Sequence, residues 1–345
     1  MKRRPSWIRK PRSQPNGTRS DHAFVSYGRY LTSRQALRLE TLIAKDPTDV
    51  GSRLQLIGYY GEHPDLHWRT RSLVWAHKFW MIENRPADYA CYYFGRPQSQ
   101  QRADEYKRTW LRQVRKHASN WNVLCNAANC LLYVDEALGY RLFHRALKLK
   151  PKWGLPARRI AQSYRAKAIK GPRDQRANSA KNAFKYAQLA LKLQDSPGEK
   201  KGILTEFTHV AIKYHQFDLA RRWANRLVRL EFEDFTMWQQ YGYVYLTALE
   251  YAQGNLHRTK IYLAKLTESF KKAPCHVMSH PMLLALLQDL VAQGETETVL
   301  FYADAACEAS ESNAAKKQWR AWATILRRGK TPAFEWTKVP PWKRS

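Results

Sequence analysis

Residues 122–151 of this chain read NVLCNAANCLLYVDEALGYRLFHRALKLKP, and this stretch decides the fold. Apolar residues recur every three or four positions in each half, the spacing at which side chains share one face of a helix. Val134 and Asp135 separate the two halves, and Pro151 ends the second because proline cannot continue a helix. The stretch therefore predicts two antiparallel helices with apolar faces formed by Leu124, Ala127, Ala128 and Leu131 and by Leu138, Leu142, Ala146 and Leu149.

The end of this hairpin recurs later in the chain. The tetrapeptide Ala-Leu-Lys-Leu occupies residues 146–149 and again residues 190–193, and a proline follows each copy within a few positions. A recurrence in this range is typical of stacked helical hairpins, and we expect about six or seven of them between roughly residues 34 and 328. The extra length between the two copies predicts an extended loop over residues 169–178.

Two short motifs resemble a known family. One has the spacing W-x2-L-G-x2-Y, with tyrosine in place of the leucine, and the other has the order small residue, aromatic residue, alanine, proline. The matching residues are Trp238, Tyr241, Gly242 and Tyr245 in the first motif and Gly139, Phe143, Ala146 and Pro151 in the second. The chain thus looks like a degenerate tetratricopeptide repeat (TPR) protein. The resemblance implies an all-α, right-handed α-solenoid of TPR-like hairpins whose inner groove binds proteins or peptides.

The expected domain organisation follows from these patterns. Residues 1–30 form a basic, aromatic N-terminal tail, and residues 331–345 form a basic C-terminal tail rich in proline and tryptophan. The solenoid occupies residues 31–330. Within it, residues 84–101 form an irregular link, in addition to the loop over residues 169–178. Prolines near each terminus disfavour helix there, so both tails are expected to be extended.

The charge of the chain is uneven. Lys and Arg number 59 and Asp and Glu number 29, which gives a net charge of +30. Nearly all of the excess lies in residues 1–20, 141–192 and 316–345, and the central block contains a single acidic residue, Asp174. Such blocks are typical of proteins that meet a polyanion, an acidic partner or an anionic membrane surface.

The central block places its cations at helical spacing. One stripe of candidate binding residues would run down the helix that ends near Pro151, a second down a later helix, and a third set would face the groove in the register of the repeat family. These sets are Arg141, Arg145, Lys148 and Lys152; Lys181, Lys185 and Lys192; and Arg158, Gln162 and Arg165. They predict contacts to an anionic ligand, for example phosphates. The alternative is a solvated face that keeps the protein soluble, although ordinary helices mix both signs for that purpose.

The tails offer further candidate residues in Trp7, Trp336 and Trp342, each in a proline-bearing, basic segment. These rings could stack on nucleic-acid bases while Lys or Arg contacts the backbone. They could also anchor the tails in a protein pocket, or pack back on the end of the solenoid as a cap.

The sequence contains no nucleotide-binding, nucleophile-elbow or zinc-protease motif, so we expect a binding protein and not an enzyme. The favoured interpretation is a scaffold that holds an acidic protein or peptide through its groove and a basic face. The alternative is an RNA- or DNA-associated protein that contacts phosphates without sequence specificity; attachment to an anionic membrane is less favoured. We expect no cofactor and no metal.

The five cysteines, an odd number in a long chain, indicate a reducing compartment. No apolar run is long enough to span a bilayer. We therefore expect a cytoplasmic protein. The alternative is an organellar matrix, with the basic N-terminus as a presequence.

Overall fold

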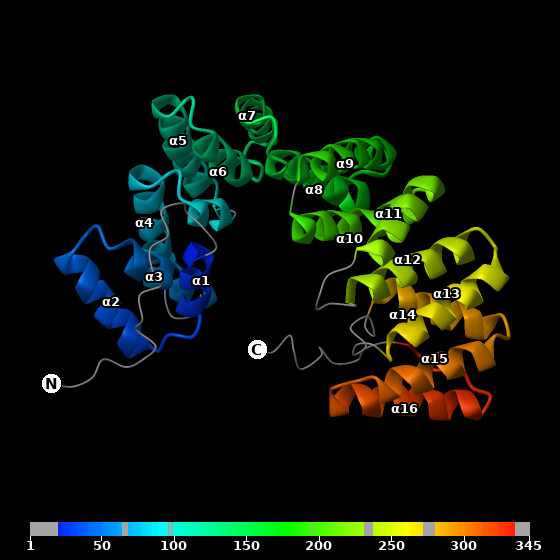
Figure 1. The fold of residues 1–345 in the computed structure, drawn as a ribbon. Helices are drawn as coiled ribbons and strands as arrows, with labels where there is room; N and C mark the ends of the chain where they lie inside the picture. The colour runs from blue at the N-terminus through cyan, green and yellow to red at the C-terminus, as the bar shows by residue number, and fades with distance from the viewer. Residues whose placement is uncertain are drawn as a thin grey trace. The chain divides into compact units, whose positions relative to one another are not determined.

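The computed structural model describes residues 20–63, 68–95, 97, 99–194, 196–230, 237–271 and 280–334, and the described residues contain helices and no strand (Figure 1). The all-α prediction is confirmed. The chain divides into two compact units, residues 1–160 and 161–345, and the division falls inside one helix, α8 (Leu155–Lys170). None of the described helices combines the length and the apolar character that crossing a lipid bilayer requires.

The first unit is a succession of helices, each packed on the next from α2 to α7. The exception is α1, which packs on α3 and on the short 3-10 helix η2. The elements are α1 (Ser20–Gly28), α2 (Ser33–Lys45), α3 (Val50–Glu62), α4 (Trp68–Asn84), η2 (Tyr89–Tyr93), α5 (Gln100–Lys116), α6 (Trp121–Leu131) and α7 (Glu136–Leu149).

Polar side chains fix where several of these helices begin. Thr32 and Gln35 form a reciprocal capping box at the start of α2. The Asn120 side chain accepts hydrogen bonds from two backbone N–H groups at the start of α6, and the Asp135 carboxylate accepts one from Leu138 at the start of α7. The hairpin expected over residues 122–151 is therefore present as α6 and α7, and its turn is set by the Asp135 cap.

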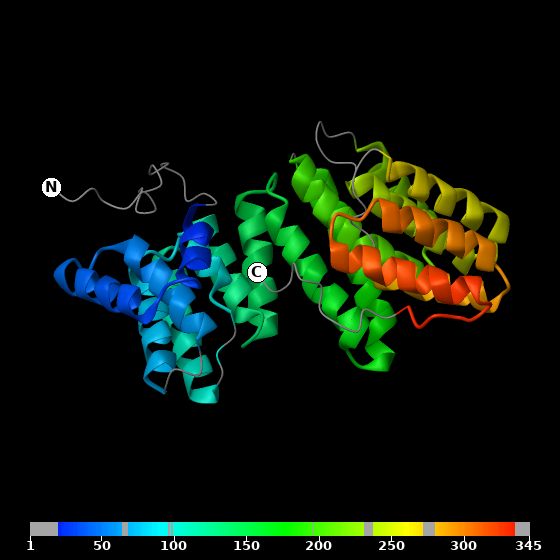
Figure 2. The same ribbon diagram turned by 90° about the horizontal axis from the view of Figure 1, so that it is seen from below.

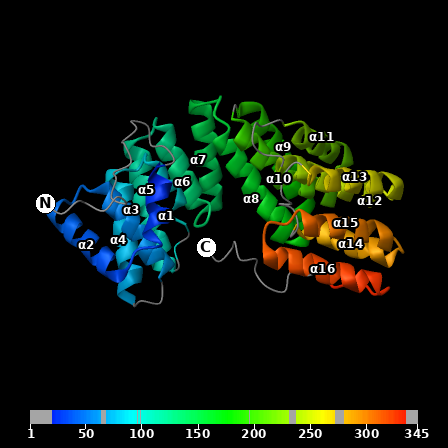
Figure 3. The ribbon, with the colours of Figure 1, turned by 60° about the horizontal axis from the view of Figure 1, so that its bottom comes forward.

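The second unit stacks helical hairpins. Neighbouring helices pack on each other from α9 to α13 and from α14 to α16, and alternate helices also touch: α10 with α12, α12 with α14, and α13 with α15. Figures 2 and 3 show the last helices of this unit lying side by side. The elements after α8 are α9 (Arg173–Leu193), α10 (Pro197–Lys213), α11 (Phe217–Arg229), α12 (Met237–Ala252), α13 (Leu256–Ser269), α14 (Pro281–Ala292), α15 (Thr296–Glu308) and α16 (Asn313–Arg327).

Two of the motif glycines allow helices to approach closely. A Cβ at Gly242 in α12 would lie 2.6 Å from the Val228 Cγ2 atom and 2.9 Å from the Val228 backbone nitrogen. A Cβ at Gly139 in α7 would lie 2.9 Å from the Leu132 backbone nitrogen. Real Cβ atoms do not come this close, so only glycine fits at these two helix contacts.

Parts of the expected domain organisation are wrong. The extended loop predicted over residues 169–178 does not exist, because α8 continues to Lys170 and α9 begins at Arg173. The N-terminal tail was expected to reach residue 30, but α1 starts at Ser20 and packs on α3. Within the link predicted over residues 84–101, the described residues between α4 and α5 form no helix except η2.

The described residues 331–334 after α16 form neither helix nor strand, and one of them packs back on the second unit. Phe334 is 3% exposed, and its ring lies 5.1 Å from that of Trp322. Trp322 in turn contacts Trp319, which contacts Tyr302 on α15. Phe334 therefore extends the aromatic core of the second unit beyond its last helix.

Candidate partner-binding surfaces

The stripe predicted on the helix before Pro151 lies on α7. Arg141, Arg145 and Lys148 are exposed, while Phe143 and Ala146 on the other side of the helix are completely buried. The apolar side of α7 therefore faces the core, and the cations face solvent. The Arg145 Nη2 atom donates a hydrogen bond to the Ala118 carbonyl oxygen at 2.7 Å, which ties α7 to the turn between α5 and α6.

Lys152 was expected to continue this stripe, but α7 ends at Leu149 and Lys152 lies in the turn that follows. The helical spacing i, i+11 therefore does not apply to it. Lys152 is exposed, and it adds a positive charge near the C-terminus of α7 and not along its side.

The second predicted stripe lies on α9 in the second unit. Lys181, Lys185 and Lys192 are exposed, and Ala183 and Ala187 on the apolar side are fully buried. In the part of the chain that the structure describes, neither these three lysines nor the exposed cations of α7 and its following turn form an ion pair. Their charge is therefore available to an external anion.

The third predicted set lies on α8 and is half-buried. Arg158 belongs to the first unit, and Gln162 and Arg165 belong to the second. The Gln162 Nε2 atom donates a hydrogen bond to the Glu206 carboxylate on α10 at 2.6 Å. The Arg165 Nε atom is buried and has no hydrogen-bond partner within the described residues.

Two histidines join Arg165 on the same face of the second unit. Burial, together with the positive charge of Arg165, lowers the pKa of His209 on α10 to about 4. Burial and the proximity of His209 lower the pKa of His280, just before α14, to about 4 as well. Tyr245 on α12 is buried beneath this face: its ring is 5.5 Å from that of His280, and its hydroxyl donates a 2.9 Å hydrogen bond to the carbonyl of Thr205.

Residues from α8, α10, α12 and the start of α14 therefore share one surface, which we call the inner face of the second unit. It is defined by Gln162, Arg165, Glu206, His209, Tyr241 and His280. Sequence reasoning predicted two of these residues through the family register. It missed the histidines, whose common location depends on the packing of alternate helices.

An unpredicted cluster lies in the first unit. The rings of Trp121 and Trp153 meet edge to face, with centroids 4.1 Å apart. The Lys150 ammonium lies 3.8 Å from the centroid of the Trp121 ring and 5.7 Å from that of Trp153. Both tryptophans are partly exposed and Lys150 is exposed, so an aromatic pair presents a cation to solvent.

A buried acid–imidazole pair in the first unit has a structural role. The His77 Nε2 atom is 3.2 Å from the Glu40 carboxylate, and its Nδ1 atom is 3.4 Å from the Arg53 guanidinium. Because arginine only donates, Nδ1 accepts and Nε2 carries the proton. Burial alone would raise the pKa of Glu40, but hydrogen bonds from His77 and Tyr60 outweigh it and hold the pKa below its usual value. Both ring nitrogens of His77 are thus engaged in joining α2, α3 and α4, and neither is left for a substrate.

A cavity of about 520 Å³ opens between α4 and α5. Its lining contains three arginines and two glutamates, and the Arg112 guanidinium is 2.7 Å from the Glu83 carboxylate. The carboxylates offset most of the positive charge, so this cavity is a weaker anion site than the unpaired cations nearby. The lining residues are Phe79, Glu83, Glu105, Arg108, Thr109, Arg112 and Arg115.

Trp7, Trp336 and Trp342 lie outside the described residues, so their predicted roles stay predictions. Across the described ranges, His, Cys, Asp and Glu side chains nowhere gather in threes in the manner of a metal site. No protein-family model matches this chain, and no curated protein sequence matches it either.

Proposed function

We propose that this protein is a non-enzymatic scaffold, a TPR-like right-handed solenoid, that holds an acidic protein or peptide on the inner face of its second unit. The observation that carries the proposal is the environment of Arg165. Its Nε atom is buried without a hydrogen-bond partner among the described residues, and its charge disfavours protonation of the neighbouring His209. A carboxylate bound here would accept hydrogen bonds from Arg165 and relieve that repulsion.

The same face already contains one carboxylate, Glu206, whose hydrogen bond to Gln162 shows how an acidic side chain is held there. The partly exposed rings of Tyr241 and His280, whose centroids are 5.7 Å apart, supply rigid aromatic surface on this face, as a binding anchor requires. The exposed lysines of α9 would add long-range attraction, which accelerates association with an acidic partner and weakens as salt is added.

The test uses a fluorescent poly-glutamate peptide as the acidic probe and measures its anisotropy with the full chain. Arg165→Gln should weaken binding roughly tenfold or more, because a hydrogen bond to a charged group contributes about 1.5 to 3 kcal/mol. Arg222→Gln is the matched control, since Arg222 is exposed on α11 of the same unit and makes the same change in net charge.

The control variant should bind within about twofold of the unchanged protein, as expected for a distant surface charge screened by salt. Equal loss in both variants would show that the probe responds to net charge alone, and the inner face would then have no specific role.

A further inference from the structure

Three helix ends meet at one end of the α5–α7 group in the first unit: the C-termini of α5 and α7 and the N-terminus of α6. Two contacts hold them together. Arg145 on α7 donates to the Ala118 carbonyl in the α5–α6 turn, and the Trp121 ring at the start of α6 packs on Trp153 after α7. This end of the molecule, which we call the tryptophan end, is therefore a built surface and not a set of independent side chains.

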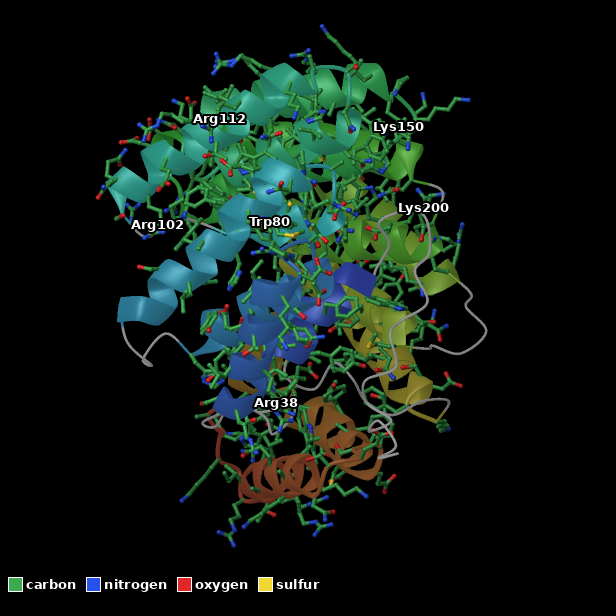
Figure 4. All side chains as sticks on the ribbon, turned by 90° about the vertical axis from the view of Figure 1, so that its left-hand side faces the viewer. Arg38, Trp80, Arg102, Arg112, Lys150 and Lys200 are labelled. Atoms are coloured by element: carbon green, nitrogen blue, oxygen red, sulfur yellow. The ribbon has the colours of Figure 1, made fainter. Side chains whose placement is uncertain are left out.

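The tryptophan end carries six exposed cations. They come from the last turn of α5, from α7 and from the turn after it: Arg115, Lys116, Arg145, Lys148, Lys150 and Lys152. None of the six forms an ion pair with a described residue. Arg112 and Lys150 are labelled in Figure 4, in the part of the first unit that α5 and α7 form.

Acidic residues are absent from the surrounding sequence. None occurs in residues 106–134 or in residues 137–160, the two segments of the first unit around this end. One or two cations at each helix C-terminus would be enough to complement the helix dipole. A surface that serves only solubility mixes both signs. The accumulation of six like charges around two helix ends therefore indicates a ligand with several negative charges.

The two tryptophans indicate what kind of ligand this is. Partly exposed Trp rings among Lys and Arg are the combination that single-stranded nucleic acid requires, because bases stack on the rings while cations neutralise the backbone phosphates. The carboxylate side chains of an acidic peptide pair with the cations but do not stack on a tryptophan ring as a base does. Lys150 lies over Trp121 in the free protein, and a base that stacks on this ring would displace it toward a phosphate.

We propose that the tryptophan end binds single-stranded nucleic acid without sequence specificity, through six cations and the Trp121–Trp153 pair. This site is separate from the inner face of the second unit and does not depend on the function proposed for it. The two proposals therefore fail independently.

The first experiment measures anisotropy of a labelled oligouridylate of about 12 nucleotides, a length within the range of one single-strand site. If all six cations neutralise phosphates, log K should fall linearly with the logarithm of the salt concentration, with a slope of about −4. The affinity should then fall about 250-fold between 50 and 200 mM salt. The double variant Lys148→Gln, Lys152→Gln should reduce the magnitude of that slope by about 1.4.

The matched control is Lys265→Gln with Lys271→Gln, which removes the same charge from α13 and the turn after it in the second unit and leaves the tryptophan end intact. The control should change the slope little. An equal reduction in both double variants would overturn the assignment, because the oligonucleotide would then respond only to net charge.

The second experiment tests the rings and the class of ligand. Trp153→Leu should weaken oligouridylate binding roughly tenfold, since stacking contributes about 1 to 3 kcal/mol per base, and Trp153→Phe should restore part of the loss. Thermal melting by circular dichroism identifies any variant that fails to fold, and Lys150→Met then tests the cluster without removing a ring.

Two competition results would also overturn the proposal. Poly-glutamate that displaces the oligonucleotide at equal charge concentration would identify a site for acidic peptides. Duplex DNA that binds as tightly as the single strand, with no effect of Trp153→Leu, would identify a phosphate surface without base contact.

Discussion

Replacing Gly242 by alanine tests the closest helix contact of the second unit. A Cβ at this position would lie 2.6 Å from Val228 Cγ2, 2.9 Å from the Val228 backbone nitrogen and 3.0 Å from the Ala224 carbonyl oxygen. The last two atoms belong to the backbone of α11, so no side-chain rotation relieves the overlap. The α11 and α12 helices would have to separate.

Two effects of opposite sign decide the magnitude. Alanine has a higher helix propensity than glycine by about 1 kcal/mol, which favours the variant. Overpacking a helix contact against backbone costs about 2 to 3 kcal/mol, the upper part of the usual range. The free energy of unfolding should therefore fall by about 1 to 2 kcal/mol, although the substitution improves propensity.

Gly198→Ala is the matched control. Gly198 is exposed in the first turn of α10, and a Cβ there would meet only the Ser196 hydroxyl, at 3.7 Å. This variant should be neutral, or more stable by up to about 1 kcal/mol, because alanine restricts the unfolded chain. Urea unfolding followed by circular dichroism compares the two variants within the same unit. If Gly242→Ala proves as stable as Gly198→Ala, the close approach of α11 and α12 is wrong.

Three further perturbations have defined outcomes. Trp319→Ala, at a fully buried ring, should lower the free energy of unfolding by about 3 to 5 kcal/mol; Phe301→Ala, at a ring that is 63% exposed, should change it by less than about 0.5 kcal/mol in the same urea titration. Asp135→Ala removes the cap of α7 and should cost about 1 kcal/mol in thermal melting, whereas Asp135→Asn should retain most of the stability because asparagine also caps. The pKa values of His209 and His280 are about 4 in the folded chain and about 6.5 in the unfolded chain, so the unfolded chain binds more protons between these pH values. The free energy of unfolding should therefore fall as the pH falls through this interval. The melting temperature of the His209→Gln, His280→Gln double variant should depend less on pH.

The helical hairpin at residues 122–151 could be predicted because its information is local. Apolar spacing, the Asp135 cap and Pro151 all act within one helix length. The exposed stripes on α7 and α9 followed from the same periodicity, since the side of a helix opposite its apolar face points to solvent.

The boundaries that were wrong have identifiable causes. Gly171 and Pro172 are typical of a loop, but a proline just before a helix and an acidic residue such as Asp174 in its first turn are also signals of a helix start. The sequence pattern does not predict α1, because this helix follows a basic, proline-rich segment and because its apolar residues gain stability only by packing on α3.

The missing site residues depend on contacts between distant parts of the chain. Trp121 and Lys150 are brought together by the antiparallel packing of α6 and α7, and no local period relates them. His209 and His280 meet across alternate helices of the second unit. Sequence patterns predict which faces of a helix are apolar, but they do not predict which residues of different hairpins become neighbours.

The burial of Phe334 has a consequence for self-association. The last helix of any repeating stack resembles the ones before it, so its outer surface can accept a further copy and start an open filament. Here Phe334 packs on Trp322 and leaves that ring 2% exposed. A truncation before Phe334 should therefore expose apolar surface on α16 and promote self-association while the helices are retained.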